Sequence, residues 1–182
     1  MKTTFYMVRH GQPDWGWAET MRFFGPCSAY MPLTPLGVEQ IEHTACDPQL
    51  RGAAFILASP YTRTMQSAQI LSRRLDLPVT VEWDLHEWLY DRDMKGDLPT
   101  PEERFGREDM TRCFFHYMEH DELGGEDNCE TAAVIAERVL ACLHRYDGQA
   151  EKIIVVCHEG VIRSVTGMKA VNLGQVVPVT LE

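Results

Sequence analysis

Three short polar motifs each follow an apolar segment, and their residue types suit phosphate chemistry. Arg9-His10-Gly11 follows residues 3–8, Ser59-Pro60 follows residues 54–58, and His158-Glu159-Gly160 follows residues 153–157. Apolar runs of this length predict buried β-strands. A neutral histidine can attack phosphorus, arginine offers paired N–H donors to a phosphoryl group, and glycine allows close backbone approach. Together with Arg63, just after the second motif, they predict an anion site where the strand ends meet.

Displacement at phosphorus also needs an acid that protonates the leaving oxygen. We expect Glu87 in this role, because Trp83 and Trp88 beside it could desolvate the carboxyl and raise its pKa. Glu82 and Asp84 are competing carboxylates. Asp84 is nearer the expected strand end, so the choice between it and Glu87 stays open at this stage.

Apolar and helical periodicities alternate along the chain. Strands are expected at residues 3–8, 54–58, 78–81, 153–157 and 175–180, and helices at 34–46, 61–75, 102–119, 131–146 and 161–170. Thr34-Pro35 is a typical helix start, with threonine as N-cap and proline in the first turn. Alternating strands and helices predict an α/β fold, a three-layer αβα sandwich with a mostly parallel central sheet. The strand ends then lie at one edge of that sheet.

Length and composition predict one domain. The chain has 182 residues, 45% of them hydrophobic, and we expect a single domain over 1–182 with an insert or lid at about 91–125. The net charge of −10 argues against a nucleic-acid partner. No apolar run approaches the roughly 18 residues of a membrane span, and the six cysteines show no C-x-x-C spacing. We therefore expect a soluble cytoplasmic protein with free thiols and no membrane association.

Three other features of the sequence offer alternatives. His116 to His120 fits an H-x-x-E-H zinc motif, and Asp91 to Glu102 is similar to a calcium loop that carries a lysine at a ligand position. We interpret both as coincidences and expect no metal. The long segment 11–33 is rich in aromatic residues, which either pack on the body of the protein or face a substrate.

Five motifs, in order along the chain, resemble those of the histidine phosphatase superfamily, the phosphoglycerate mutase-like family. They are Met7-Val8-Arg9-His10-Gly11, residues 32–40 (PLTPLGVEQ), residues 58–64 (ASPYTRT), Gly124-Gly125-Glu126 and residues 155–160 (VVCHEG). The resemblance implies a phosphoglycerate mutase-like fold and a phosphohistidine intermediate. It also implies that neither a metal nor an organic cofactor is needed.

The resemblance implies a role for each site residue. His10 would be the phosphorylated nucleophile, Glu87 the acid and base, and Arg9, Arg63 and His158 the phosphoryl ligands. Further contacts to phosphate or substrate are expected from Gly11, Gln12, Ser59 and Glu159.

Two positions depart from the family pattern. Glu159 stands where the family often has glycine, and Gly16 stands where many members, including the mutases, have asparagine. Glu159 would add negative charge near the phosphate unless it points away, or would recognise a polar group of the substrate. Gly16 removes a candidate polar contact, which favours a phosphatase over a mutase, and we expect an enzyme of the histidine acid phosphatase type that acts on a small phosphorylated metabolite. The alternatives are a phosphomutase with the same intermediate and a non-catalytic module that binds a phosphorylated ligand. A homodimer stays open.

Overall fold

The computed structural model describes residues 2–17, 29–89 and 130–181. Its elements are β1 (Thr4–Arg9), α2 (Pro35–Thr44), the 3-10 helix η2 (Pro48–Leu50), β2 (Ile56–Ala58), α3 (Thr62–Leu75), β3 (Val79–Val81), the 3-10 helix η3 (Trp83–Leu85), α5 (Ala132–His144), β4 (Lys152–Cys157), α6 (Glu159–Thr166) and β5 (Val176–Thr180). The helix expected at 102–119, the insert at 91–125 and the zinc-like, calcium-like and Gly124-Gly125-Glu126 motifs lie outside the described residues.

The strands form one sheet in the order β3-β2-β4-β1-β5. Three pairings are parallel, namely β1 with β4, β4 with β2 and β2 with β3, and β5 runs antiparallel to β1. In this register Arg9 lies opposite Cys157, and Ala58 lies opposite Val156. The residues that follow β1, β2 and β4 therefore leave the sheet at the same edge. The mostly parallel sheet is confirmed.

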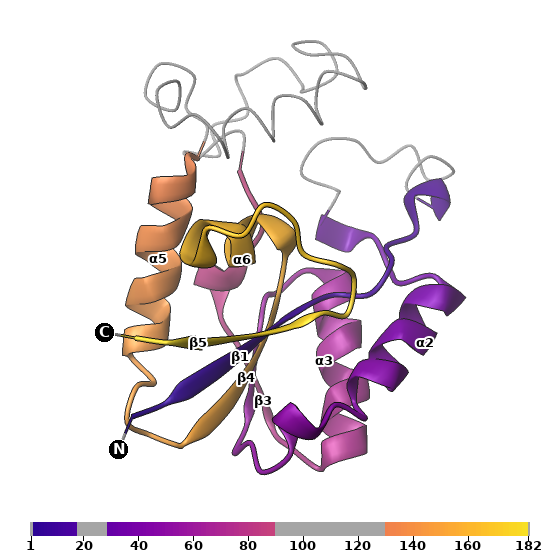
Figure 1. Ribbon diagram of the computed structural model, residues 1–182. Helices are drawn as coiled ribbons and strands as arrows, with labels where there is room; N and C mark the ends of the chain where they lie inside the picture. Colours follow the sequence, from indigo (N-terminus) through magenta and orange to yellow (C-terminus); the bar gives the residue numbers. More distant parts are fainter. Residues whose placement is uncertain (1, 18–28, 90–129, 182) are drawn as a thin grey trace.

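Strand β4 separates two apolar layers, because successive side chains of a strand point to opposite faces. Ile153, Val155 and Cys157 pack with α5 and α6 on one face. Ile154 and Val156 pack with α2 and α3 on the other. Figure 1 shows the sheet between these two pairs of helices. The three-layer αβα arrangement and the core position of Cys157 are confirmed.

Two helix starts near the sheet edge decide how site residues are presented. Helix α2 begins as expected, with the Thr34 hydroxyl accepting a hydrogen bond from the Gly37 amide at 3.0 Å. Helix α6 was expected at 161–170 but spans Glu159–Thr166. Its start directly follows His158, and it ends because Gly167 adopts a left-handed conformation with φ of 71°. His158 is thus the N-cap residue of α6.

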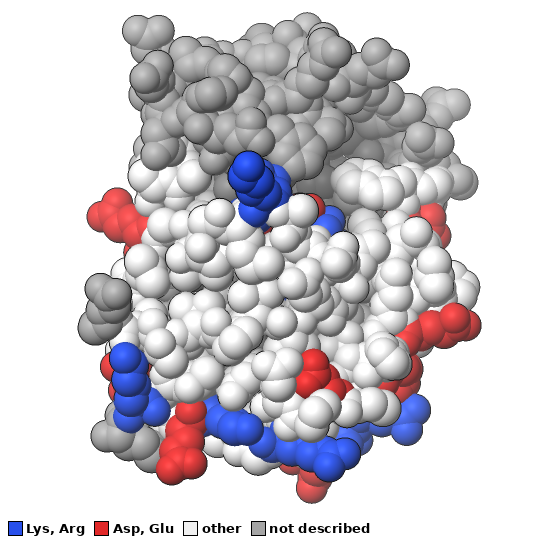
Figure 2. Space-filling view, in the orientation of Figure 1, with Lys and Arg blue, Asp and Glu red and all other residues white. Residues whose placement is uncertain are grey.

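The described surface carries charges of both signs. On the face in Figure 2, a row of basic side chains lies along the lower edge, with acidic side chains beside it. Within the described ranges, no helix has the length and apolar character needed to cross a bilayer.

Candidate active site

Four polar side chains from three strand ends meet at the carboxyl edge of the sheet. They are His10 after β1, Ser59 after β2, Arg63 in the first turn of α3, and His158 after β4; we call them the strand-end cluster. Arg63 joins the two histidines, donating from Nε to His10 Nε2 at 3.1 Å and from Nη2 toward His158 Nδ1 at 3.2 Å. The two imidazole rings lie edge to face, 5.2 Å between centroids. The structure therefore brings the strand-end cluster together, as the sequence predicted.

The contacts of His10 decide its tautomer. Its Nδ1 lies 2.7 Å from the carbonyl oxygen of Gly11. Because a carbonyl can only accept, Nδ1 carries the proton and Nε2 presents a lone pair. The side chain is 4% exposed, which excludes a surface histidine in a turn. Burial, followed by the charge of Arg63, holds the pKa of His10 well below its ordinary value, so the imidazole is neutral near pH 7.

His158 is fixed on both ring nitrogens. Arg63 can only donate, so Nδ1 accepts and the Nε2–H donates to Ser59 Oγ at 2.8 Å. His158 and Ser59 are fully buried. Burial and then the charge of Arg63 keep the pKa of His158 well below its ordinary value. A negatively charged ligand would oppose both effects, because it favours the charged imidazolium.

Glu87 follows η3, and its carboxyl reaches the start of α6. Oε2 lies 3.4 Å from the amide of Gly160, two residues after His158, and Oε1 accepts from the Trp88 amide at 3.1 Å. Loss of solvation raises the pKa of Glu87 above its ordinary value, against the opposing effect of the Trp88 amide and the charge of Arg63. The expected rise is therefore present. Trp83, however, is 54% exposed and packs on His86 instead.

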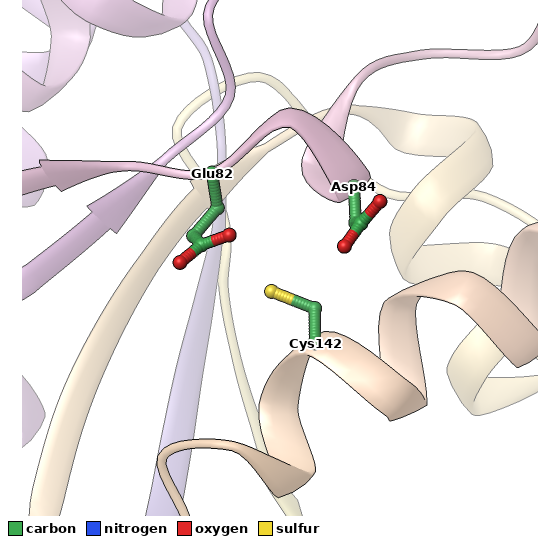
Figure 3. A group of neighbouring side chains, drawn as sticks. All are labelled: Glu82, Asp84 and Cys142. Carbon is green, nitrogen blue, oxygen red and sulfur yellow. The ribbon is translucent and has the colours of Figure 1, made fainter.

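The competing carboxylates turn another way. Figure 3 shows Glu82 and Asp84 converging with Cys142 of α5, and the potential ligand atoms of these three residues lie within 4.8 Å of one another. Arg145 donates to both carboxylates, at 2.7 Å to Glu82 and 3.1 Å to Asp84. The guanidinium already supplies the positive charge that a metal would bring, and burial raises the pKa of Cys142 to about 12, so its thiol stays protonated. Glu82 and Asp84 are thus engaged by Arg145, whereas the Glu87 carboxyl lies beside the Gly160 amide near His158.

Arg9 and Glu159 form an ion pair beside the strand-end cluster. Arg9 Nη1 lies 2.9 Å from Glu159 Oε2 and also donates to the carbonyl oxygen of Val171. Glu159 Oε1 accepts weakly from the Val171 amide at 3.4 Å. Arg9 Nε is buried and has no hydrogen-bond partner among the described residues. The Glu159 carboxylate thus points to Arg9, whose positive charge offsets its negative charge.

Gly11 and Gln12 connect β1 to the start of α2. A Cβ atom on Gly11 would lie 2.2 Å from the carbonyl oxygen of Gly37, so backbone packing alone requires glycine there. Gln12 donates from its amide to Gln40 Oε1 at 2.8 Å, and its own Oε1 accepts from Thr34 at 2.8 Å. Contact of Gly11 or Gln12 with a phosphate stays a prediction.

The aromatic residues expected in the long loop are only partly described. Trp15 and Tyr30 are each 62% exposed, and Trp17 is partly buried, whereas Phe23 and Phe24 lie outside the described residues. The two ends of the segment are tied by an isolated bridge between Pro13 and Leu33. Contact of this loop with a substrate stays a prediction.

Sequence reasoning missed three residues around the cluster. The Tyr61 ring lies 5.0 Å from that of His158 and 5.1 Å from the Arg63 guanidinium carbon, and its place between Ser59 and Arg63 was an available signal. Glu130 and Arg138 form a buried ion pair at 2.7 Å that contacts the backbone on both sides of Glu87. Their spacing along the chain carries no signal of that contact.

The chain matches a known protein family over most of its length. The model of the histidine phosphatase superfamily (branch 1) matches residues 5–172. Among curated proteins, "Probable phosphoglycerate mutase GpmB" of Proteus mirabilis is 33% identical over 82 residues, which cover 45% of this chain. The matched part spans only 36% of the length of that relative.

Solved structures share the fold at low identity. A mycobacterial glucosyl-3-phosphoglycerate phosphatase superposes with a TM-score of 0.70 and 18% identity, covering 98% of this chain and 90% of its own. A protein described as mycobacterial hydrolase 1 gives a TM-score of 0.70 and 17% identity, covering 99% and 92%. At these identities the likeness establishes the fold.

Proposed function

The chain belongs to the histidine phosphatase superfamily, and from this premise we propose that it hydrolyses small-molecule phosphate monoesters through a phosphohistidine at His10. One observation carries the proposal: the Gly11 carbonyl holds the proton on Nδ1 of a buried, neutral His10, which leaves Nε2 as the nucleophile. Arg63 donates to that nitrogen and also contacts His158 Nδ1, and these two side chains would supply donors for a phosphoryl group.

The proposed reaction has two displacements. His10 Nε2 forms a bond to phosphorus while the ester P–O bond breaks, and Glu87 gives its proton to the leaving oxygen. Water then attacks the phosphohistidine, Glu87 takes a proton from that water, and inorganic phosphate leaves. The raised pKa of Glu87 suits both steps, since an acid and a base work best with a pKa near the operating pH.

Two charged groups are proposed to bind the phosphoryl oxygens. The Arg63 N–H groups that now donate to the imidazoles would turn to the phosphate dianion, which offers stronger charge-assisted hydrogen bonds. The buried Arg9 Nε, which lacks a partner among the described residues, would be satisfied in the same way. His158 would bind as an imidazolium once the dianion raises its pKa.

Hydrolysis is favoured over transfer to a second hydroxyl. Gly16 stands where many family members, including the mutases, have asparagine, so a polar contact that a mutase would use is missing. Phosphomutase activity is the second candidate, since the curated relative with 33% identity is named as a phosphoglycerate mutase. Assays for phosphoglycerate isomerisation distinguish the two.

Three finer points belong to the same proposal. We propose turnover of the histidine acid phosphatase type, which needs no metal, because two arginines and a protonated carboxyl can supply the electrophilic contacts. We propose a small metabolite as substrate and no nucleic-acid partner. A cytoplasmic location is supported by Cys46, Cys142 and Cys157, the described cysteines, which are free thiols.

Hydrolysis of an aryl phosphate in the presence of EDTA tests the proposal. Wild-type protein should release phosphate, and His10→Ala should lose nearly all activity. His144→Ala, which changes an exposed histidine of α5, is the matched control and should keep it. Full activity of His10→Ala would exclude the mechanism. Binding of inorganic phosphate without turnover of any ester would indicate a binding module.

A further inference from the structure

The segment that carries Glu87 has no regular secondary structure, yet it is fixed on both sides. Before Glu87, the carbonyl groups of Asp84 and His86 both accept from the Arg138 guanidinium, the latter from Nη2 at 2.9 Å. After Glu87, the Leu89 amide donates to Glu130 Oε2 at 2.9 Å. Figure 3 shows η3 lying along α5, the helix that contributes Arg138.

Glu130 and Arg138 act on this segment as one unit. Arg138 donates from Nε to Glu130 Oε1 at 2.7 Å and from Nη2 to Oε2 at 3.0 Å, a fork geometry that arginine alone can make. The Glu130 backbone adds two bonds: its amide donates to the Leu89 carbonyl, and its carbonyl accepts from the Trp88 indole, both at 2.8 Å. The pair thus contacts the chain on either side of Glu87.

A contribution to stability does not by itself explain this arrangement. The side chains of Glu130 and Arg138 are 4% and 14% exposed. The cost of desolvating such a pair often equals or exceeds its Coulomb attraction, so a buried ion pair is weak evidence for stabilisation. Its hydrogen bonds go instead to the backbone groups that determine where the Glu87 side chain starts. The carboxyl of Glu87 in turn reaches the Gly160 amide beside His158.

We propose that Glu130 and Arg138 are positioning residues that hold the Glu87 carboxyl where it protonates the leaving oxygen. The inference rests on the proposed phosphatase function and deepens it. Neither residue touches the substrate, and both act through the backbone of residues 84–89. Displacement of that carboxyl by about 1 Å would weaken proton transfer strongly while leaving the His10 nucleophile unchanged.

Dependence on the leaving group separates this role from a structural one. Dinitrophenyl phosphate expels a stable phenolate without an acid, whereas an alkyl phosphate needs a proton. For Arg138→Met we expect kcat/KM, which reports only the step that phosphorylates His10, to fall roughly tenfold to hundredfold on the alkyl phosphate and less than about threefold on dinitrophenyl phosphate. Glu87→Gln should show the same pattern. The double variant should be no slower than Glu87→Gln alone, because Arg138 acts through Glu87.

Two further variants complete the test. Arg145→Met is the matched control. It removes the arginine at the C-cap of α5, which contacts the Asp84 side chain but not the backbone beyond it, and it should change neither rate. Arg138→Lys keeps the charge without the fork, so it should show a selective loss and replaces the methionine variant if that one does not fold. Equal losses on both esters, or additive losses in the double variant, would overturn the proposal. If wild-type protein hydrolyses neither ester, the proposed function itself fails, which is a separate outcome.

Discussion

Replacement of Ser59 by alanine should reduce both stability and activity, because this hydroxyl holds the ring of His158. The 2.8 Å bond joins two fully buried side chains, and alanine leaves the Nε2–H without its partner. An unsatisfied buried donor costs about 1–3 kcal/mol of unfolding free energy. The freed ring also loses its orientation toward Arg63, for which we expect kcat to fall roughly tenfold to hundredfold.

Urea denaturation and steady-state hydrolysis of an aryl phosphate measure these two effects. Ser72→Ala is the matched control, since it also removes a serine hydroxyl, one that donates to the Leu77 carbonyl at 2.6 Å near the end of α3. The control should lose stability but keep its kcat. If Ser59→Ala loses no more activity than Ser72→Ala, the inferred tautomer and orientation of His158 are refuted.

Three further changes test other parts of the site. Gly11→Ala should destabilise the fold by more than about 2 kcal/mol, measured by chemical denaturation, because its Cβ would overlap the Gly37 carbonyl; a stable variant would contradict this close packing. Glu159→Gln should release Arg9 from its ion pair and lower the inhibition constant of inorganic phosphate about fivefold. This corresponds to about 1 kcal/mol, the value of a partly exposed ion pair. An unchanged inhibition constant would show that Arg9 does not bind phosphate. Glu87 acts as an acid only while protonated, so kcat for an alkyl phosphate should fall as pH rises through its raised pKa, and Glu87→Gln should lack this alkaline fall. An unaltered pH profile would assign the titration to another group.

The parts of the site that follow from local patterns could be predicted from the sequence. Apolar runs placed His10, Ser59 and His158 at strand ends, and parallel strands bring such ends to one edge. The parallel register of β1, β2 and β4 confirms this reasoning. The N-cap of α2 at Thr34 is equally local and was also predicted correctly.

Contacts between distant segments could not be predicted in this way. Arg138 donates to the carbonyl of His86, 52 positions away, and nothing in the periodicity of α5 distinguishes it from the exposed Arg145. The direction of the Glu159 carboxylate depends on where Arg9 lies across the sheet edge. Such side-chain choices follow from packing of the whole domain and carry no signature in a short window of sequence.

The central claim is that His10 carries the phosphoryl group during turnover. Rapid quenching in base of the protein during hydrolysis of an ester radiolabelled at phosphorus tests it most directly. The account predicts a protein-bound label that is stable in base, labile in acid, mapped to the peptide containing His10 and absent from His10→Ala. Turnover without any such label, or a label retained in His10→Ala, would contradict it.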